Sequence, residues 1–290
     1  MANLKEIRSR ISSVSSTMQI TSAMKMVSAA KLKKAQDAIT AMRPYAEKLT
    51  ELLEIISATL DAKTENKFAA QREVKNVLIV AITSNRGLCG AFNSNILKQV
   101  SKLTTETYVD QEVSFLAIGK KANDALSKTG RVIANKSGVF DDLTFENVSE
   151  IAEMLMEKFV EGEFDKIEIV YNKFKNAATQ IVMTEQFLPL PVPEVKDDEI
   201  AIEETEYIFE PSKNEIVEQL IPKSLKILLY KGIRDSFASE HGARMTAMHK
   251  ATDNATDLRD ELKLTYNKAR QAAITNEILE IVGGAEALNN

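Results

Sequence analysis

The sequence predicts an α/β protein in which long N- and C-terminal helices form an antiparallel coiled coil that carries a small doubly wound α/β domain. Two observations predict the coil: residues 1–43 and 243–282 contain neither Gly nor Pro, and each stretch has an apolar heptad repeat. A third predicts the domain: between residues 74 and 193, β-branched apolar runs alternate with amphipathic stretches. At about 1.5 Å per residue, a helix over 243–282 would be roughly 60 Å long, so we expect it to project from a small domain.

Four segments follow from these patterns. They are an N-terminal coiled-coil helix (1–60), an α/β domain (74–193), an acidic loop with a short strand (194–210) and a C-terminal coiled-coil helix (211–290).

The N-terminal helix has a seam that weakens in its middle. Apolar residues occupy heptad positions at both ends, namely Leu4, Ile7, Ile11, Val14 and Met18, and then Leu32, Ala35, Ile39 and Met42. Between them the same register passes through the polar Thr21, Lys25 and Ser28. Either the seam shifts to Ala23, Met24 and Val27, or a third surface contacts this segment. Pro44 is expected to interrupt or kink the helix.

The central domain alternates strands and helices. Strands are predicted at 76–83, 113–118, 131–135, 166–173 and 180–187, and helices at 92–103, 120–127 and 148–160. The first strand is apolar throughout, which is typical of a strand buried on both faces of a parallel sheet. The last two strands alternate apolar and polar residues, which favours a sheet edge or an antiparallel pair. This order predicts a Rossmann-like topology.

Three prolines, at positions 189, 191 and 193, end the domain. Residues 194–206 are strongly acidic and predict a solvated loop, followed by a short strand at 207–210. The last helical region should start at Pro211-Ser212, with Ser212 or Asn214 as cap, divide or kink at Pro222, and end at Gly283-Gly284. Its heptad seam is predicted at His241, Arg244, Met248, Ala251, Ala255, Leu258, Leu262, Thr265, Ala269, Ala272, Asn276 and Leu279.

Composition excludes several classes of function. A formal net charge of −5 argues against a nucleic-acid-binding protein, and no apolar run reaches the length of a membrane span. The single Cys89 suits a reducing compartment. No catalytic constellation, metal site or cofactor site is predicted. As a nucleophile Cys89 would need a base, and the two histidines, His241 and His249, are expected to be exposed on the last helix.

Three local features have more than one interpretation or suggest a partner. The turn at 84–90 (SNRGLCG) lacks a phosphate-loop motif, so it is a glycine-containing turn, an exposed contact loop anchored by Arg86, or a phosphate site. The last helix carries polar side chains and then an apolar tip over 278–285, and an exposed apolar tip requires a partner. The basic residues of the first helix are either a solvated face or a surface for an acidic partner.

Four stretches together resemble the gamma subunit of F-type ATP synthases. They are KEIRSRISSVSSTMQITSAMKMVSAAKLKKAQ near the N-terminus, the turn SNRGLCGAFN, LPLP at 188–191, and the C-terminal run from ARMTAMHK to EILEIVGG. The family commonly has Asp where this chain has Asn85.

The resemblance implies a function. It implies a central rotor stalk, not catalytic alone and without cofactor, which couples proton flow through the membrane sector to ATP synthesis or hydrolysis at the beta subunits. It implies one copy per complex, with alpha, beta, epsilon and c-ring as partners, held peripherally at the cytoplasmic face of the bacterial plasma membrane. Without the resemblance, the alternative is an α/β nucleotide-binding domain with a coiled-coil oligomerisation arm.

The resemblance also implies site residues. Contacts with the alpha and beta subunits are expected at Met24, Lys25, Arg86, Gly87, Cys89, Arg244, Arg270, Gln271, Thr275, Glu277 and Glu280. The foot that meets epsilon and the c-ring is expected around Tyr207.

Overall fold

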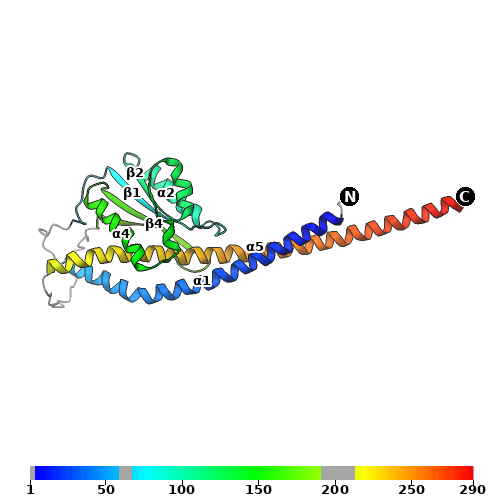
Figure 1. Ribbon diagram of the computed structural model, residues 1–290, viewed down its shortest axis with the longest axis horizontal. Helices are drawn as coiled ribbons and strands as arrows, with labels where there is room; N and C mark the ends of the chain where they lie inside the picture. The colour runs from blue at the N-terminus through cyan, green and yellow to red at the C-terminus, as the bar shows by residue number, and fades with distance from the viewer. Residues whose placement is uncertain (1–3, 59–66, 191–212, 290) are drawn as a thin grey trace, which may run out of the picture. The chain divides into compact units, whose positions relative to one another are not determined.

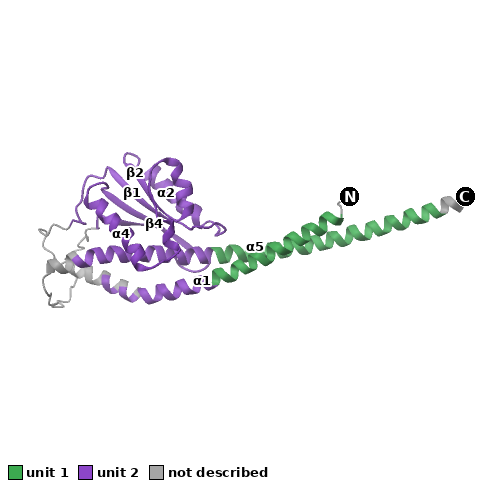
Figure 2. Ribbon diagram, in the orientation of Figure 1, with its two compact units in different colours: residues 1–29, 244–290 green, residues 30–243 purple. Residues whose placement is uncertain are grey.

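The computed structural model describes residues 4–58, 67–190 and 213–289. The chain forms two compact units, coloured separately in Figure 2. The coil unit comprises residues 1–29 and 244–290, and the head unit comprises residues 30–243. Both long helices contribute to both units, so the compact units are divided within the helices and not at residues 60 and 211.

The head unit contains a five-stranded sheet with the order β3-β2-β1-β4-β5. The strands are β1 (Asn76–Ile82), β2 (Glu112–Ile118), β3 (Val132–Asn135), β4 (Lys166–Phe174) and β5 (Gln180–Leu188). The first four are parallel, and β5 pairs antiparallel with β4 at the edge of the sheet. The predicted α/β fold class is therefore confirmed, including the antiparallel pairing of the last two strands.

Helices cover both faces of the sheet (Figure 1). On one face, α2 (Phe92–Lys102) and α3 (Lys120–Leu126) pack on β-strand residues such as Val77, Ile79 and Ala81. On the other, α4 (Phe145–Val160) and α5 (Lys213–Asn289) pack on Leu78, Val80 and Ile82. Alternate side chains of β1 therefore enter two separate cores, as expected of a strand buried on both faces.

Shorter turns complete the head unit. A π-helical turn, Leu103–Thr107, extends α2, and 3₁₀ turns occupy Ser127–Thr129 and Ser137–Phe140. Helix α4 begins three residues before its predicted start, because the side chain of Thr144 caps it by accepting a hydrogen bond from the Asn147 amide at 3.3 Å.

Both long helices continue through an internal proline, and α5 also continues through two glycines. Helix α1 spans Leu4–Ala58 and includes Pro44, whereas α5 includes Pro222 and continues through Gly283 and Gly284. The predictions that Pro44 interrupts α1, that Pro222 divides α5 and that the helix ends at Gly283 are therefore wrong, whereas the alternative of a kink at either proline stays a prediction. An internal proline costs about 3 kcal/mol, and beside Pro222 the burial of Ile221 and Leu225 in the core offsets that cost.

Several predicted features lie outside the described residues. Residues 191–212 contain the predicted acidic loop at 194–206, the predicted strand at 207–210 with Tyr207, and the proposed cap Ser212.

Within the coil unit, α1 and α5 run antiparallel. The hydroxyl of Thr252 donates to that of Thr21 at 2.8 Å, and the hydroxyl of Thr256 approaches the Met18 sulfur at 3.4 Å. Further along, Arg8 donates to the Tyr266 hydroxyl at 2.9 Å. Residue numbers thus fall on α1 as they rise on α5, which confirms the predicted coiled coil closed within one chain.

The seam of α1 does not shift away from its polar heptad positions. Thr21 and Ser28 are 9% and 2% exposed, whereas Ala23 and Val27 are exposed. The buried hydroxyls donate to carbonyls of their own helix, Thr21 to Met18 O at 3.1 Å and Ser28 to Met24 O at 2.8 Å. Because these bonds satisfy the hydroxyls, polar residues can stay in the seam, and the predicted shift to Ala23, Met24 and Val27 is wrong.

The seam of α5 uses only some of the predicted positions: Met248 and Ala255 are buried as predicted, but others are not. Thr252, Arg259 and Tyr266 contact α1, whereas Leu258 is 46% exposed and Thr265 is exposed. Every residue from 270 to 285 is exposed, so Ala272, Asn276 and Leu279 do not extend the seam. In the coil unit, α5 therefore continues beyond its pairing with α1 (Figure 1).

Candidate functional site

The residues singled out by the sequence fall into both compact units. Met24, Lys25, Arg244 and the five residues between 270 and 280 belong to the coil unit, and Arg86, Gly87 and Cys89 belong to the head unit. The two groups are considered separately.

The exposed end of α5 presents both polar and apolar side chains. Arg270, Gln271, Thr275, Glu277 and Glu280 all lie on this stretch and are exposed. Four apolar side chains accompany them, each more than half exposed: Ile278, Leu279, Ile281 and Val282. A soluble protein rarely displays such a contiguous apolar surface unless another molecule covers it.

A second apolar surface lies on α1. Met24 and Lys25 are half-buried, and close to them Ile20, Met26 and Val27 are 57–65% exposed. These three residues were not assigned to the site from the sequence. Their signal was available, because they are apolar residues outside the heptad positions of a two-helix seam.

Arg244 differs from the other predicted contact residues of the coil unit. It is only 8% exposed, so its guanidinium is covered by the chain's own atoms. This burial agrees with the predicted heptad seam, which includes Arg244.

The turn after β1 is held together by side chains. Asn93, in the first turn of α2, donates to the Ser84 hydroxyl at 2.8 Å and to the Cys89 sulfur at 3.1 Å, and it accepts from the Ser84 amide at 3.0 Å. The Ser84 hydroxyl in turn donates to Arg86 O at 2.6 Å. Asn93 was missed at the sequence level, where only its low helix propensity near a helix start could have indicated a capping role.

The tip of this turn displays Arg86 and Leu88. Both are exposed, and Leu88 has a φ of 62°, in the left-handed region that non-glycine residues rarely adopt. Gly87 lies beside Lys121, whose Cε is 4.0 Å from where a Cβ would be. An exposed apolar side chain on a strained backbone is typical of a contact loop.

Both the nitrogen and the oxygen of the Asn85 side-chain amide form hydrogen bonds. Its Nδ2 donates to Ser137 O at 3.0 Å, and its Oδ1 accepts from the Lys120 amide at 2.9 Å. An aspartate could accept the second bond but could not donate the first. Asn85 therefore connects the turn to two neighbouring segments.

Cys89 and the histidines do not form a nucleophile–base pair on the surface. Cys89 is 1% exposed and packs with Phe92 and Ala243. His241 is buried against the Phe237 ring, whose centroid is 4.5 Å away, so its predicted exposure is wrong. His249 is exposed as predicted, and its Nδ1 lies 3.2 Å from an Asp253 carboxylate oxygen.

In the head unit, the chain's own side chains occupy the crevice where doubly wound domains usually bind ligands. That crevice lies at the carboxyl ends of β1 and β4, where the strand order reverses. Here Asn172 of β4 donates to Phe92 O at 3.1 Å, and Ser239 of α5 donates to Asn172 O at 2.9 Å. Cys89, Phe92 and Ala243 form an apolar cluster beside these bonds.

A buried ionisable cluster lies elsewhere in the head unit. The Tyr108 hydroxyl donates to Glu168 Oε1 at 2.5 Å, and the Lys166 ammonium lies 3.0 Å from the same oxygen. Burial, and then the hydrogen bond to Glu168, raise the pKa of Tyr108 to about 12. None of the predicted site residues belongs to this cluster.

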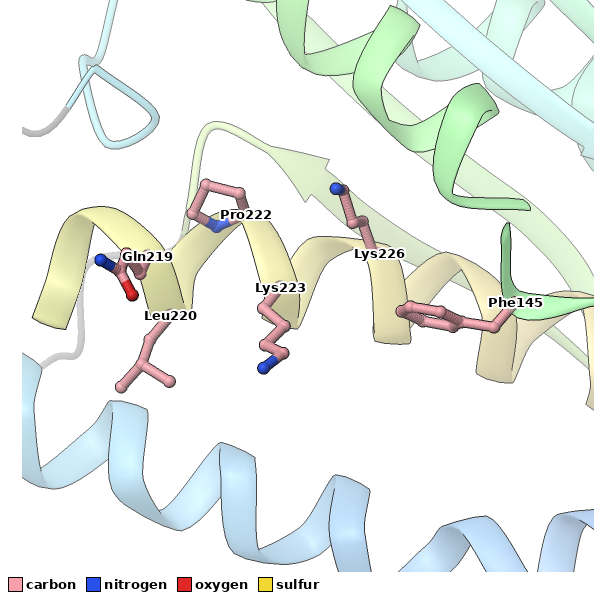
Figure 3. A pocket seen from close by; sticks show the side chains of 6 residues that line it. All are labelled: Phe145, Gln219, Leu220, Pro222, Lys223 and Lys226. Atoms are coloured by element: carbon pink, nitrogen blue, oxygen red, sulfur yellow. The ribbon is translucent and has the colours of Figure 1, made fainter. Parts of the chain in front are cut away.

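The head unit also has a cavity of about 390 Å³ along α5, lined by Phe145, Gln219, Leu220, Pro222, Lys223 and Lys226. Figure 3 shows that Lys223 and Lys226 point to opposite sides of the helix. Lys226 is paired with Glu153. The two ammonium groups therefore do not converge on one anion, and the cavity contains none of the predicted site residues.

Among the described residues, no group of side chains is placed to hold a metal ion. Within residues 4–58, 67–190 and 213–289, no helix is long and apolar enough to cross a membrane.

Comparison with known proteins gives consistent matches along the chain. The family model described as ATP synthase matches residues 3–288. The chain is 74% identical over 288 residues to an ATP synthase gamma chain of Flavobacterium psychrophilum, with 99% of each chain covered. It is 72% identical over 290 residues to the ATP synthase gamma chain of Flavobacterium johnsoniae, with both chains covered completely.

Solved structures share the fold. A chain from the mitochondrial ATP synthase of Euglena gracilis, solved as OSCP/F1/c-ring, aligns with a TM-score of 0.69 at 24% identity, covering 98% of this chain and 94% of that one. A chain from the rotor of the same enzyme aligns with a TM-score of 0.66 at 22% identity, covering 93% of this chain and 98% of that one. The resemblance inferred from the motifs is thus confirmed, and the chain belongs to the family of ATP synthase gamma chains.

Proposed function

We propose that this gamma chain is the central rotor stalk of an F-type ATP synthase and couples proton flow through the membrane sector to ATP synthesis or hydrolysis on the beta subunits. It turns as a single copy inside the ring of alpha and beta subunits. Its asymmetry carries the beta subunits through their binding states.

The exposed end of α5 is the observation that supports this proposal most directly. From residue 270 to 285 the helix has no partner helix among the described residues, yet it carries exposed apolar side chains at 278, 279, 281 and 282. Exposed apolar side chains gathered on one stretch of helix are normally covered by another molecule. A ring of alpha and beta subunits would supply that surface.

Contact with the beta subunits is proposed at three exposed or half-exposed places. These are the polar residues of the α5 end, the Met24–Lys25 region of α1, and the turn with Arg86, Gly87 and Cys89, whose exposed members are Arg86 and Leu88. The cationic Lys25 and Arg86 suit an acidic surface on beta. Arg244 is included in the proposed contact set, although reaching its buried guanidinium would require local rearrangement.

The foot is proposed to meet epsilon and the c-ring around Tyr207. Through these partners the chain would be held peripherally at the cytoplasmic face of the bacterial plasma membrane.

We further infer that the chain is not catalytic by itself. The crevice at the ends of β1 and β4 is occupied by Phe92, Asn172 and Ser239, which leaves this usual nucleotide position filled. Titration of the purified chain with ATP, followed by calorimetry, should give no binding at micromolar ATP. Tight binding would support the alternative of a nucleotide-binding domain.

Reconstitution tests the rotor proposal. Alpha and beta subunits assembled with this chain should hydrolyse ATP faster than the same subunits without it. The double change Arg270→Ala and Gln271→Ala should reduce this stimulation by at least roughly tenfold, because the loss of one charged hydrogen bond at Arg270 alone costs on the order of 1.5–3 kcal/mol.

Lys268→Ala is the matched control, since Lys268 is another exposed cation on the same helix and lies outside the proposed contact set. It should leave the stimulation unchanged. Equal hydrolysis with and without the chain would contradict the proposal.

A further inference from the structure

Helix α5 changes character along the face that packs on the sheet. Its first buried residues are large, with Ile221, Leu225, Leu229 and Ile233 in the main core of the head unit. Farther along, the buried residues include the small Ser236, Ser239 and Ala243. The helix can therefore approach the sheet more closely near the end of β4, because small side chains separate the backbones less.

Helix α5 comes close to the β4–β5 turn at Gly242. A Cβ at this position would lie 3.2 Å from Ala177 Cα, 3.3 Å from Ala177 O and 3.4 Å from a Phe174 ring carbon. Its φ lies outside the left-handed region, so the backbone conformation does not require glycine. The requirement is space against the β4–β5 turn, whose backbone cannot easily move.

Directional bonds accompany this close contact. The fully buried Ser239 donates to Asn172 O on β4 at 2.9 Å, and the Asn172 side chain donates to Phe92 O at the start of α2 at 3.1 Å. Helix α5 is thus connected through β4 to the segment that follows β1.

An apolar contact completes the arrangement. Ala243, next to Gly242, packs with Cys89 and Phe92, both almost fully buried. Helix α5 therefore contacts three separate segments of the head: the turn after β1 with the start of α2, the end of β4, and the β4–β5 turn.

We propose that these contacts form a shaft lock that transmits torque between the head and the shaft, which is the part of α5 beyond Ala243. The lock is made of Ser239, Gly242 and Ala243 on α5 and of Cys89, Phe92, Asn172 and Ala177 in the rest of the head. The inference rests on the proposed rotor function. Apolar burial is non-directional and permits a helix to slide or turn on a sheet. A hydrogen bond and a tight backbone contact on different segments fix both the rotation and the axial position of α5. Beyond the lock, α5 continues as one helix to Asn289.

Gly242→Leu tests the steric part of the lock in the complete, membrane-bound enzyme. Two rates are measured on the same inverted vesicles: ATP hydrolysis and ATP-driven proton pumping. The variant should retain hydrolysis and lose pumping, because a shaft that slips against the head allows the beta subunits to turn over without driving the membrane ring. Gly138→Leu is the matched control, since a Cβ at exposed Gly138 meets nothing within 4 Å, and it should leave both rates unchanged.

Ser239→Ala is the milder variant for the case in which Gly242→Leu fails to assemble. It removes a single hydroxyl and should lower the ratio of protons pumped to ATP hydrolysed in assembled enzyme. A variant that merely destabilised the fold would lower the amount of assembled enzyme and both rates in parallel. An unchanged ratio in both Ser239→Ala and Gly242→Leu would overturn the proposal.

A cross-link provides a rescue test. Ala243→Cys places a second thiol beside the native Cys89, and oxidation with copper phenanthroline should join the two within one chain. In the Ser239→Ala background this disulfide should restore the pumping ratio, and its reduction should lower the ratio again. A ratio that oxidation does not restore would refute the lock, as would failure of the disulfide to form.

These outcomes separate the inference from the function on which it rests. If complexes with the native chain pump protons but the lock variants remain coupled, only the lock is wrong. If the native chain supports neither stimulated hydrolysis nor pumping, the rotor proposal itself fails.

Discussion

Among individual residues, Tyr108 has the clearest electrostatic signature in the head unit. Its hydroxyl donates to Glu168 Oε1, and the Lys166 ammonium lies close to the same oxygen. Burial lowers the pKa of Lys166, but hydrogen bonds to Tyr108 and Glu168 outweigh that effect and raise it overall. Three ionisable groups thus stabilise one another in a largely water-excluded position, which the sequence could not indicate because Tyr108 and Glu168 are 60 residues apart.

This cluster makes the stability of the head unit depend on alkaline pH. The pKa of Tyr108 rises from 10.0 to about 12 on folding. Below pH 10 the phenol is protonated in both states, and its contribution is fully present. Between pH 10 and 12 the unfolded chain loses the proton first, so the free energy of unfolding should fall by up to about 3 kcal/mol.

Urea unfolding of the native chain and of Tyr108→Phe at pH 9, 10, 11 and 12 measures this contribution. The difference in unfolding free energy between the two should shrink over that window, since phenylalanine does not titrate. The other buried tyrosine, Tyr171, also has a raised pKa but is common to both chains. Parallel pH curves would contradict the assignment.

At the scale of elements, the junction between β2 and α3 depends on one glycine. Gly119 has a φ of 114°, and a Cβ there would lie 2.2 Å from Thr83 O at the end of β1. The close approach allows the Thr83 hydroxyl to accept from the Ala122 amide at 2.8 Å. The ends of β1 and β2 and the start of α3 are therefore fixed at this point.

Gly119→Ala should destabilise the chain by more than about 3 kcal/mol, because backbone strain and a clash with a carbonyl add together. Gly130→Ala is the matched comparison, since Gly130 also has a left-handed φ of 70° but nothing lies within 4 Å of an added Cβ. It should cost only about 1 kcal/mol. Thermal unfolding followed by circular dichroism compares the two, and equal losses would show that the contact with Thr83 is unimportant.

The register of α5 illustrates which properties of an element can be read from a sequence. Heptad spacing correctly predicted the buried Met248 and Ala255. It also predicted Ala251, Leu258 and Thr265 in the seam, where the structure uses Thr252, Arg259 and Tyr266. Neighbouring residues such as 251 and 252 both lie near the same helix face, and the position of the partner helix decides which one is covered. Here α1 presents Thr21, Met18 and Arg8, which favour hydroxyl and guanidinium partners over leucine.

For the whole molecule, the antiparallel coil is a contact between the two ends of one chain. The hydroxyls of Thr21 and Thr252 are 2.8 Å apart although 231 residues separate them. A head inserted between two paired helices needs no second copy of the chain to complete the seam.

Thr21→Cys combined with Thr252→Cys should therefore form a disulfide within one chain on oxidation. Non-reducing electrophoresis should give a faster-migrating monomer, and peptide mapping should join the two positions. Thr17→Cys with Thr252→Cys is the control and should not form this bond, because Thr17 is on the exposed side of α1. Cross-links found only between chains would contradict the intrachain pairing.

The sequence by itself determined the long helices, the order of strands and helices in the head, and the family, because periodicity, β-branched runs and contiguous motifs are local properties. It also located the exposed apolar end of α5 and the turn at Arg86. Only the tertiary structure decided that Pro44 and Pro222 lie inside helices, that Thr21 and Ser28 stay in the seam, and that His241 is buried. Each of these outcomes depends on atoms contributed from distant parts of the chain, whose packing offsets a local penalty that the sequence alone would count as decisive.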